Sequence, residues 1–165
     1  GDISVPPPRC VPHGRDLRQL LTGRVPSLDL GGWVNPHRSA VEQVDFLEAP
    51  NAHVQYALSQ IVSHHSIQNV ESFLEEADRV GSTKPVVFGV FFYRSANPST
   101  LSTLGSFFPV PSREIMGEFE NGNTAEEICA RSIRELRAVG AEKIYVSNLG
   151  ERAAGRMLIK ILDLV

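Results

Sequence analysis

The feature that most constrains the fold of this chain is a fourfold alternation between short apolar runs and stretches of helical spacing. The apolar runs cover Ser27–Gly31, Val54–Val62, Pro85–Phe92 and Lys143–Ser147. This alternation is typical of β/α units around a parallel sheet, whose strands are covered by helices. We therefore predict an α/β fold in which functional residues lie where the strands end.

Two of the expected helices carry a capping signal at their start. Ser39 with Glu42, and Thr124 with Glu127, have the spacing of a capping box, in which side chains and backbone amides satisfy each other. The second of these helices is predicted to run to Val139.

Glycines mark where several other elements are expected to end. Gly23, Gly81 and Gly140 each follow an apolar periodic stretch and are predicted to terminate helices. A last helix is predicted over Glu151–Val165, whereas Tyr93–Gly122 is predicted to be mostly irregular, with short helical pieces.

The composition limits the classes of partner that the chain can have. A net charge of −3 and an isoelectric point near 6.0 give no electrostatic basis for binding nucleic acid or an anionic membrane. Cys10 and Cys129 lack a metal-site spacing and are expected to be free thiols in a reducing cytosol. Neither a signal peptide nor a membrane-spanning apolar stretch is present, so we expect a soluble, cytoplasmic protein.

The length of the chain indicates part of a larger barrel. A typical eightfold β/α barrel needs about 250 residues, whereas this chain has 165 residues. We therefore expect residues 1–165 to form a single domain, the C-terminal part of a barrel truncated at its N-terminus. The open sheet edges of such a half could pair with a second copy of the chain or with the missing half.

Polar and aromatic residues near the strand ends are the first candidates for a binding site. Gln60 lies near the end of an apolar strand, and its amide either ties two loops together or contacts a ligand. Trp33, the only tryptophan, is either a core residue or a flat wall for a planar ring. His37 and Asn148 also lie at predicted strand ends, but a lone histidine is more often structural, and asparagine often forms turns.

The remaining candidates carry less information. Asp2 lies ahead of a proline-rich loop, where a carboxylate is usually solvated. His64 and His65 look like a metal pair, but the sequence offers no third ligand at a metal-site spacing, which predicts that no metal is bound. Neither a P-loop nor a G-x-G-x-x-G motif occurs, so a Rossmann-type site is not supported.

Taken together, these positions resemble the methylenetetrahydrofolate reductase family, from the end of its fourth barrel strand to its last helix. The likeness is greatest to the shorter, mycobacterial-type branch and covers effectively the whole chain. It is carried by the order and spacing of several short segments rather than by any one of them. These segments are Gly1-Asp2, Gly31 to His37, Gln43-x-Asp45, Ala57-Leu58-Ser59-Gln60, Phe88-Gly89-Val90 and Ile144 to Asn148.

The resemblance implies a (β/α)8 TIM-barrel enzyme, of which this chain is roughly the second half. Such an enzyme reduces 5,10-methylenetetrahydrofolate to 5-methyltetrahydrofolate with electrons from NADH or NADPH. By the resemblance, Asp2 would be catalytic, beside the pterin and the redox centre. Gln60 would hydrogen-bond the pterin ring, and Asn148 would close the folate side of the cleft.

The flavin is the point at which this chain departs from the family pattern. Gly31, Trp33, His37 and Asp45 match positions that line FAD in the flavin-bearing members. The family carries basic residues after the Asp45 position, whereas Glu48–Ala52 here contains an acid and no lysine or arginine. A carboxylate repels phosphate oxygens, so we expect weak FAD binding and consider direct hydride transfer from nicotinamide to the substrate.

Three interpretations stay open at this point. In the first, the chain is part of a reductase that is inactive alone, because the family's general acid, a glutamate on an early strand, has no counterpart here. In the second, it is a non-catalytic half-barrel that binds folate or nucleotide, or assembles with a partner chain. In the third, it belongs to a different (β/α)8 enzyme and has no affinity for reduced folates.

Overall fold

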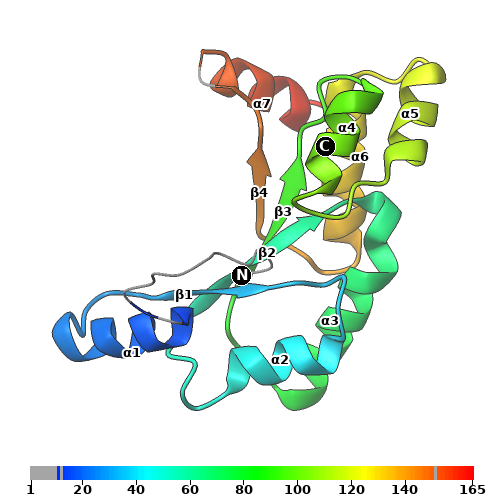
Figure 1. Cartoon of the computed structure of the whole chain (residues 1–165). Helices are drawn as coiled ribbons and strands as arrows, with labels where there is room; N and C mark the ends of the chain where they lie inside the picture. Colours follow the sequence, from blue (N-terminus) through cyan, green and yellow to red (C-terminus); the bar gives the residue numbers. More distant parts are fainter. Residues whose placement is uncertain (1–10, 12, 151) are drawn as a thin grey trace.

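The computed structural model describes residue 11, residues 13–150 and residues 152–165, in which strands alternate with helices (Figure 1). The strands are β1 (Gly31–Val34), β2 (Tyr56–Val62), β3 (Val86–Phe91) and β4 (Ile144–Ser147). The helices are α1 (Gly14–Arg24), α2 (Ala40–Glu48), the 3-10 helix η1 (His64–Ser66), α3 (Ile67–Val80), α4 (Pro98–Gly105), α5 (Ser112–Glu120), α6 (Ala125–Ala138) and α7 (Ala154–Leu162). None of these helices combines the length and the apolar character needed to cross a membrane.

The strands form a parallel sheet in the order β1-β2-β3-β4. Trp33 pairs with Leu58 between the first two strands, and Gly89 pairs with Tyr145 between the last two. Parallel neighbours require long crossover connections, and these contain α2, α3 and α6. The expected parallel α/β fold is therefore confirmed, and the strand order is compatible with half of a (β/α)8 barrel.

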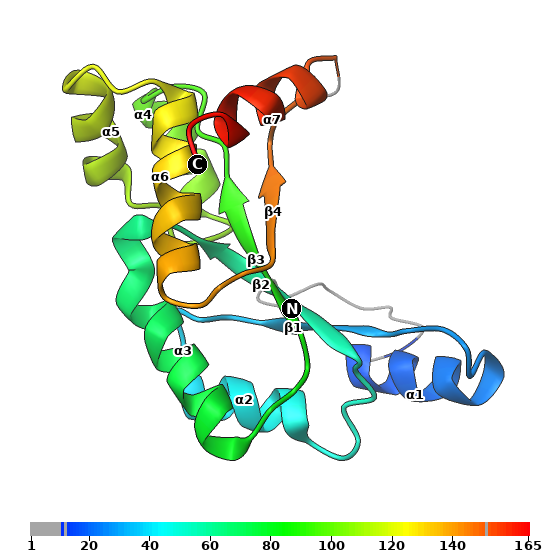
Figure 2. The same ribbon diagram turned by 180° about the vertical axis from the view of Figure 1, so that it is seen from behind.

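One face of the sheet is buried under helices. Figures 1 and 2 show α2, α3 and α6 gathered on the same side of the sheet. The core between them is built from apolar side chains that include Val34, Val44, Leu47, Ala57, Val70, Phe73, Phe88, Val90, Leu136 and Ile161. The opposite face carries no such layer in the part of the chain described, and Leu58 on that face is 36% exposed.

The segment between β3 and α6 forms a smaller cluster of its own. Leu101 of α4 and Ile115 of α5 pack with Tyr93 and with Ile128 of α6. The two short helices lie within Tyr93–Gly122, where the sequence predicted an irregular segment with helical pieces. This cluster holds the α4–α5 segment against the body of the fold.

Capping interactions set several helix ends as expected. The Thr124 hydroxyl accepts a hydrogen bond from the Glu127 amide, and the Glu127 carboxylate accepts one from the Thr124 amide, which completes the capping box. The Ser39 hydroxyl accepts from the amide three residues later. Gly81 and Gly140 adopt positive φ angles of 73° and 97° just beyond α3 and α6.

Several predicted boundaries are wrong, among them those of the last helix, which covers Ala154–Leu162 rather than Glu151–Val165. The first strand is Gly31–Val34 rather than Ser27–Gly31. Its two glycines lie inside the strand, where they make room for neighbouring side chains, and do not form a turn. A Cβ on Gly31 would come within 2.9 Å of the Tyr56 ring, and one on Gly32 within 3.0 Å of the Val54 side chain. Gly23 does not stop α1, which continues to Arg24.

Cys129 lies in the main core, and we expect its thiol to be inert. The residue is 2% exposed, and burial raises the pKa of the thiol to about 12, so neither access nor a thiolate is available at neutral pH. In a Cys10→Ser variant, a thiol reagent should label the native protein negligibly and the urea-unfolded protein completely, as measured by mass spectrometry. Rapid labelling of the native protein would show that α6 does not pack in this way.

Candidate functional site

The loop after β1 supplies the first residues of the candidate site. Asn35 is buried there, and its backbone amide donates a hydrogen bond to the side-chain oxygen of Gln43 in α2 at 2.8 Å. Its own side-chain oxygen accepts from the His37 amide at 3.1 Å. The Nε2 atom of His37 lies 2.8 Å from the Ile61 carbonyl in β2, which requires a proton on Nε2. The loop is thereby fixed to both α2 and β2.

A β-bulge near the end of β2 positions Gln60. The register between β2 and β3 shifts between Leu58 and Ile61. The Ser59 hydroxyl donates to the Gln60 carbonyl at 2.7 Å, and the Gln60 side-chain oxygen accepts from the Ile61 amide at 2.9 Å. Bulges commonly redirect a side chain next to a functional site. Here the bulge lets Gln60, which is 7% exposed, contribute to a cavity wall.

The bulge is held in place from the two following strands. The Gly89 amide in β3 donates to the Ser59 hydroxyl at 3.0 Å. The Tyr145 hydroxyl in β4 donates to the Ser59 carbonyl, also at 3.0 Å. A Cβ at position 89 would overlap the Tyr145 phenol. Glycine is therefore what allows the tyrosine to reach across β3 to β2.

These residues line a cavity at the carboxyl edge of the sheet. Asn35, His37, Arg38 and Gln60 contribute to one wall, and residues 105–109 of the α4–α5 segment form the other. The volume is about 380 Å³, within the range of small-molecule sites. We call this cavity the Gln60 cleft. Its location agrees with the expectation that functional residues gather where the strands end.

A second cavity adjoins the Gln60 cleft. It has a volume of about 220 Å³, shares His37 and Pro109 with the cleft, and extends to Tyr93 and His65. Burial raises the pKa of Tyr93, so its phenol is protonated at neutral pH. A ligand in the cleft can therefore extend toward a neutral tyrosine.

The structure brings some of the predicted site residues together. His37 and Gln60 line the same cleft. Gly31 and Trp33 lie within β1, and strand alternation puts Trp33 on the face opposite the buried Val34. Asp2 lies outside the described residues.

Two acidic residues of α2 lie away from the cleft. Asp45 is exposed and interacts electrostatically with Arg79 at the end of α3. Glu48 accepts a hydrogen bond from Ser82 and pairs with Lys84 at 3.2 Å, just before β3 begins. These partners place Glu48 at the amino edge of the sheet, opposite the Gln60 cleft. The expectation that this carboxylate weakens the binding of flavin phosphates stays a prediction.

Asn148 acts in the structure as a turn residue. It has a positive φ of 70°, and its side-chain amide donates to the Phe92 carbonyl at 2.9 Å. Its own carbonyl accepts hydrogen bonds from the Arg94 guanidinium at 2.9 and 3.2 Å. These contacts tie the ends of β3 and β4 together, and a role in closing a folate site stays a prediction.

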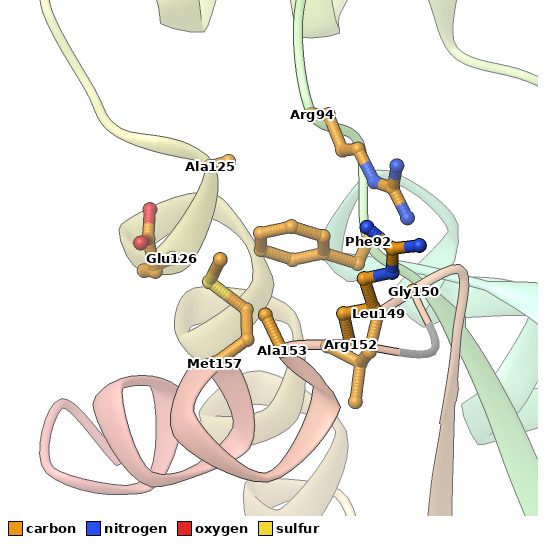
Figure 3. Close-up of a pocket in the computed structure, with 9 residues that line it drawn as sticks. All are labelled: Phe92, Arg94, Ala125, Glu126, Leu149, Gly150, Arg152, Ala153 and Met157. Carbon is orange, nitrogen blue, oxygen red and sulfur yellow. The ribbon is translucent and has the colours of Figure 1, made fainter.

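A larger cavity, which the sequence did not indicate, lies beyond the ends of β3 and β4 (Figure 3). Its volume is about 650 Å³, and its lining includes the apolar side chains of Phe92, Leu149 and Met157. Figure 3 shows Arg94 and Arg152 on one side of the cavity and Glu126 on the other. Two arginines placed shortly after neighbouring strands are the signal that could have indicated it.

The fold brings a third potential ligand to His64 and His65 that their spacing in the sequence did not indicate. The Nε2 atoms of His64 and His65 lie 2.8 and 2.6 Å from one carboxylate oxygen of Glu118 in α5. Burial lowers the pKa of His64, His65 lowers it further, and Glu118 acts in the opposite direction. The sequence could not indicate this cluster because Glu118 comes from a helix in another unit.

The packing around the bulge predicts a large effect of one methyl group. Gly89→Ala should displace Tyr145 and lower the free energy of unfolding by about 1–3 kcal/mol, measured by urea denaturation. Gly117→Ala in α5 is the control, because a Cβ there meets no atom within 4 Å. The free energy of unfolding of the control should be unchanged or higher by up to about 1 kcal/mol. Equal stability of the two variants would contradict this account of the bulge.

No family model matches this chain, and a search of curated proteins finds no match either. What the chain does must therefore be inferred from its own residues.

Proposed function

We propose that this chain is roughly the second half of a (β/α)8 barrel that reduces 5,10-methylenetetrahydrofolate to 5-methyltetrahydrofolate. The observation that carries the proposal is the position of Gln60, which a β-bulge at the carboxyl end of β2 directs toward a cleft shared with Asn35 and His37. A carboxamide offers a donor and an acceptor side by side. The Nε2 group of Gln60 could donate to the amide-like edge of a pterin ring, and Oε1, which already accepts from the Ile61 amide, has a second lone pair for it.

The volume of the cleft is compatible with a small-molecule ligand such as a pterin. The Gln60 cleft and the cavity that adjoins it have volumes of about 380 and 220 Å³ and share His37. In the proposed complex, Gln60 orients the pterin, and Asp2 lies near the reacting centre by its resemblance to the family residue. Asn148, at the end of β4, closes the folate side of the cleft by the same resemblance.

Electrons come from NADH or NADPH in this proposal. The bond from the methylene carbon to one folate nitrogen first breaks as that nitrogen takes a proton from the general acid of the other half of the barrel, which leaves an iminium at the second nitrogen. A hydride then leaves C4 of the reduced nicotinamide and forms a C–H bond at the methylene carbon, while the nicotinamide becomes a pyridinium. The chain contributes orientation and exclusion of water. Trp33 would offer a flat ring to a nicotinamide or a flavin, and Arg38 lines the cleft with a guanidinium that could compensate for the missing basic stretch. Because Glu48–Ala52 carries no lysine or arginine, FAD binding is expected to be weak. FAD would supply an intermediate carrier of the electrons.

The reaction is tested by the oxidation of reduced nicotinamide in the complete protein, with methylenetetrahydrofolate as acceptor. The assay is run first without flavin and then with added FAD. Folate-dependent oxidation without FAD would support direct hydride transfer, and activity that requires FAD would assign the flavin a role. Absence of oxidation in both, with intact folate binding, would favour the alternative of a non-catalytic folate-binding half-barrel.

The role of Gln60 is tested by binding. Gln60→Ala should weaken the affinity for 5-methyltetrahydrofolate by about 1–3 kcal/mol, because the buried pterin edge loses its hydrogen-bond partner. Isothermal titration calorimetry measures the affinity, and Trp33 provides a fluorescence signal as the only tryptophan. Gln19→Ala, at an exposed position in α1, is the matched control. Equal affinities of Gln60→Ala and the control would remove Gln60 from the site.

A further inference from the structure

A cluster of two histidines and one glutamate lies beside the residues assigned to folate. His64 and His65 form the start of η1, directly after β2. Glu118 of α5 contacts them, although it lies 54 residues after His64 and 53 residues after His65 in the chain. The cluster therefore joins two segments that the sequence places in different β/α units.

The three side chains converge with the atoms that can bind a metal. The Nε2 atoms of both histidines approach Oε1 of Glu118, and the three ligand atoms lie within 4.8 Å of one another. The side chains of His64 and Glu118 are 7% and 9% exposed. The backbone of His65 is open to solvent, while its side chain is 21% exposed. Two imidazole nitrogens and one carboxylate oxygen are a donor set that Zn²⁺ accepts.

Neighbouring side chains orient these donors from outside the cluster. The Ser132 hydroxyl in α6 lies 2.8 Å from Nδ1 of His64. If Nδ1 donates to that hydroxyl, Nε2 presents its lone pair to the cluster. Arg131 donates to the outer oxygen of Glu118, Oε2, at 3.3 Å and leaves Oε1 directed inward. Such outer contacts are typical of metal-binding histidines and carboxylates.

We propose that His64, His65 and Glu118 bind a divalent transition metal of the Zn²⁺ type. A tetrahedral ion with bonds of 2.0–2.1 Å keeps its ligand atoms about 3.3 Å apart. The present separations of 2.8 and 2.6 Å between nitrogen and oxygen are shorter than this. The Glu118 carboxylate therefore withdraws by less than about 1 Å to admit the ion.

The surroundings provide an entry path and an open coordination position. A cavity of about 550 Å³ is lined by both histidines and by Glu71 of α3. Three protein ligands leave the fourth position of a tetrahedral ion for water on this side. The carboxylate of Glu71 adds negative charge to the entry path, which favours a cation.

The bound ion would fasten η1 to α5, and through the outer contacts to α6. The α4–α5 segment supplies residues 105–109, one wall of the Gln60 cleft, and His65 also lines the adjoining cavity. A metal at this position thus holds one wall of the cleft against the sheet. The proposed metal site does not depend on folate reduction, so each of the two proposals can fail without the other.

The same side chains have a metal-free arrangement. Both Nε2 atoms can carry protons and donate to Oε1 of Glu118, with the Ser132 hydroxyl donating to Nδ1 of His64. In that case the cluster is a buried hydrogen-bonded clamp without affinity for zinc. The two arrangements make opposite predictions for a titration with metal.

The test is a zinc titration of the metal-free 165-residue chain, followed by calorimetry. One Zn²⁺ should bind per chain, and His65→Ala and Glu118→Gln should each lower the affinity at least about tenfold. His13→Ala, which removes an exposed histidine of no assigned role, is the matched control and should bind as the unmodified chain does. Circular dichroism verifies that each variant is folded.

A second measurement needs no variant. Co²⁺ bound to the unmodified chain should show the intense visible absorption of a four-coordinate site, and one equivalent of Zn²⁺ should abolish it. Absence of zinc binding, affinity that is unchanged in both folded ligand variants, or a Co²⁺ spectrum of the hydrated ion would each overturn the proposal and leave the hydrogen-bonded clamp.

Discussion

The hydrogen bond from the Tyr145 hydroxyl to the Ser59 carbonyl is the contact on which the candidate site depends. It is 3.0 Å long and joins β4 to β2 across the intervening strand. The crossing is possible only because β3 has Gly89 at that point, where a Cβ would overlap the tyrosine. The Gly89 amide in turn binds the Ser59 hydroxyl. These contacts stabilise the bulge that directs Gln60 into the cleft. The geometry of the site therefore depends on how the strands of the sheet pack.

The cavities and polar clusters that are candidates for function lie at one edge of the sheet. The Gln60 cleft lies beyond β1 and β2, and the cavity with Arg94 and Arg152 lies beyond β3 and β4. The His64 cluster follows β2 directly and borders the same region. Parallel strands bring all their carboxyl ends to one side, which is why residues from distant units meet there. The amino edge carries ion pairs such as that of Glu48 with Lys84.

Some of this arrangement could be predicted from the sequence and some could not. The parallel sheet, the Thr124 capping box and the short helices between β3 and α6 follow from local periodicity and capping chemistry. The first strand was misplaced because glycine usually signals a turn, whereas Gly31 and Gly32 make room for the Tyr56 and Val54 side chains. Asp45 was grouped with the site by the family resemblance, whereas the structure places it at an exposed position near Arg79.

By itself, the sequence determined the class of fold and the candidates His37 and Gln60, because strand periodicity and polar interruptions are properties of neighbouring residues. Only the tertiary structure decided that Gln60 sits in a bulge held from β4 and that Asn148 serves a turn. It alone brought Glu118 to the two histidines. The physical reason is the same in each case: these arrangements depend on side chains that are separated by more than fifty residues and meet only when the β/α units pack.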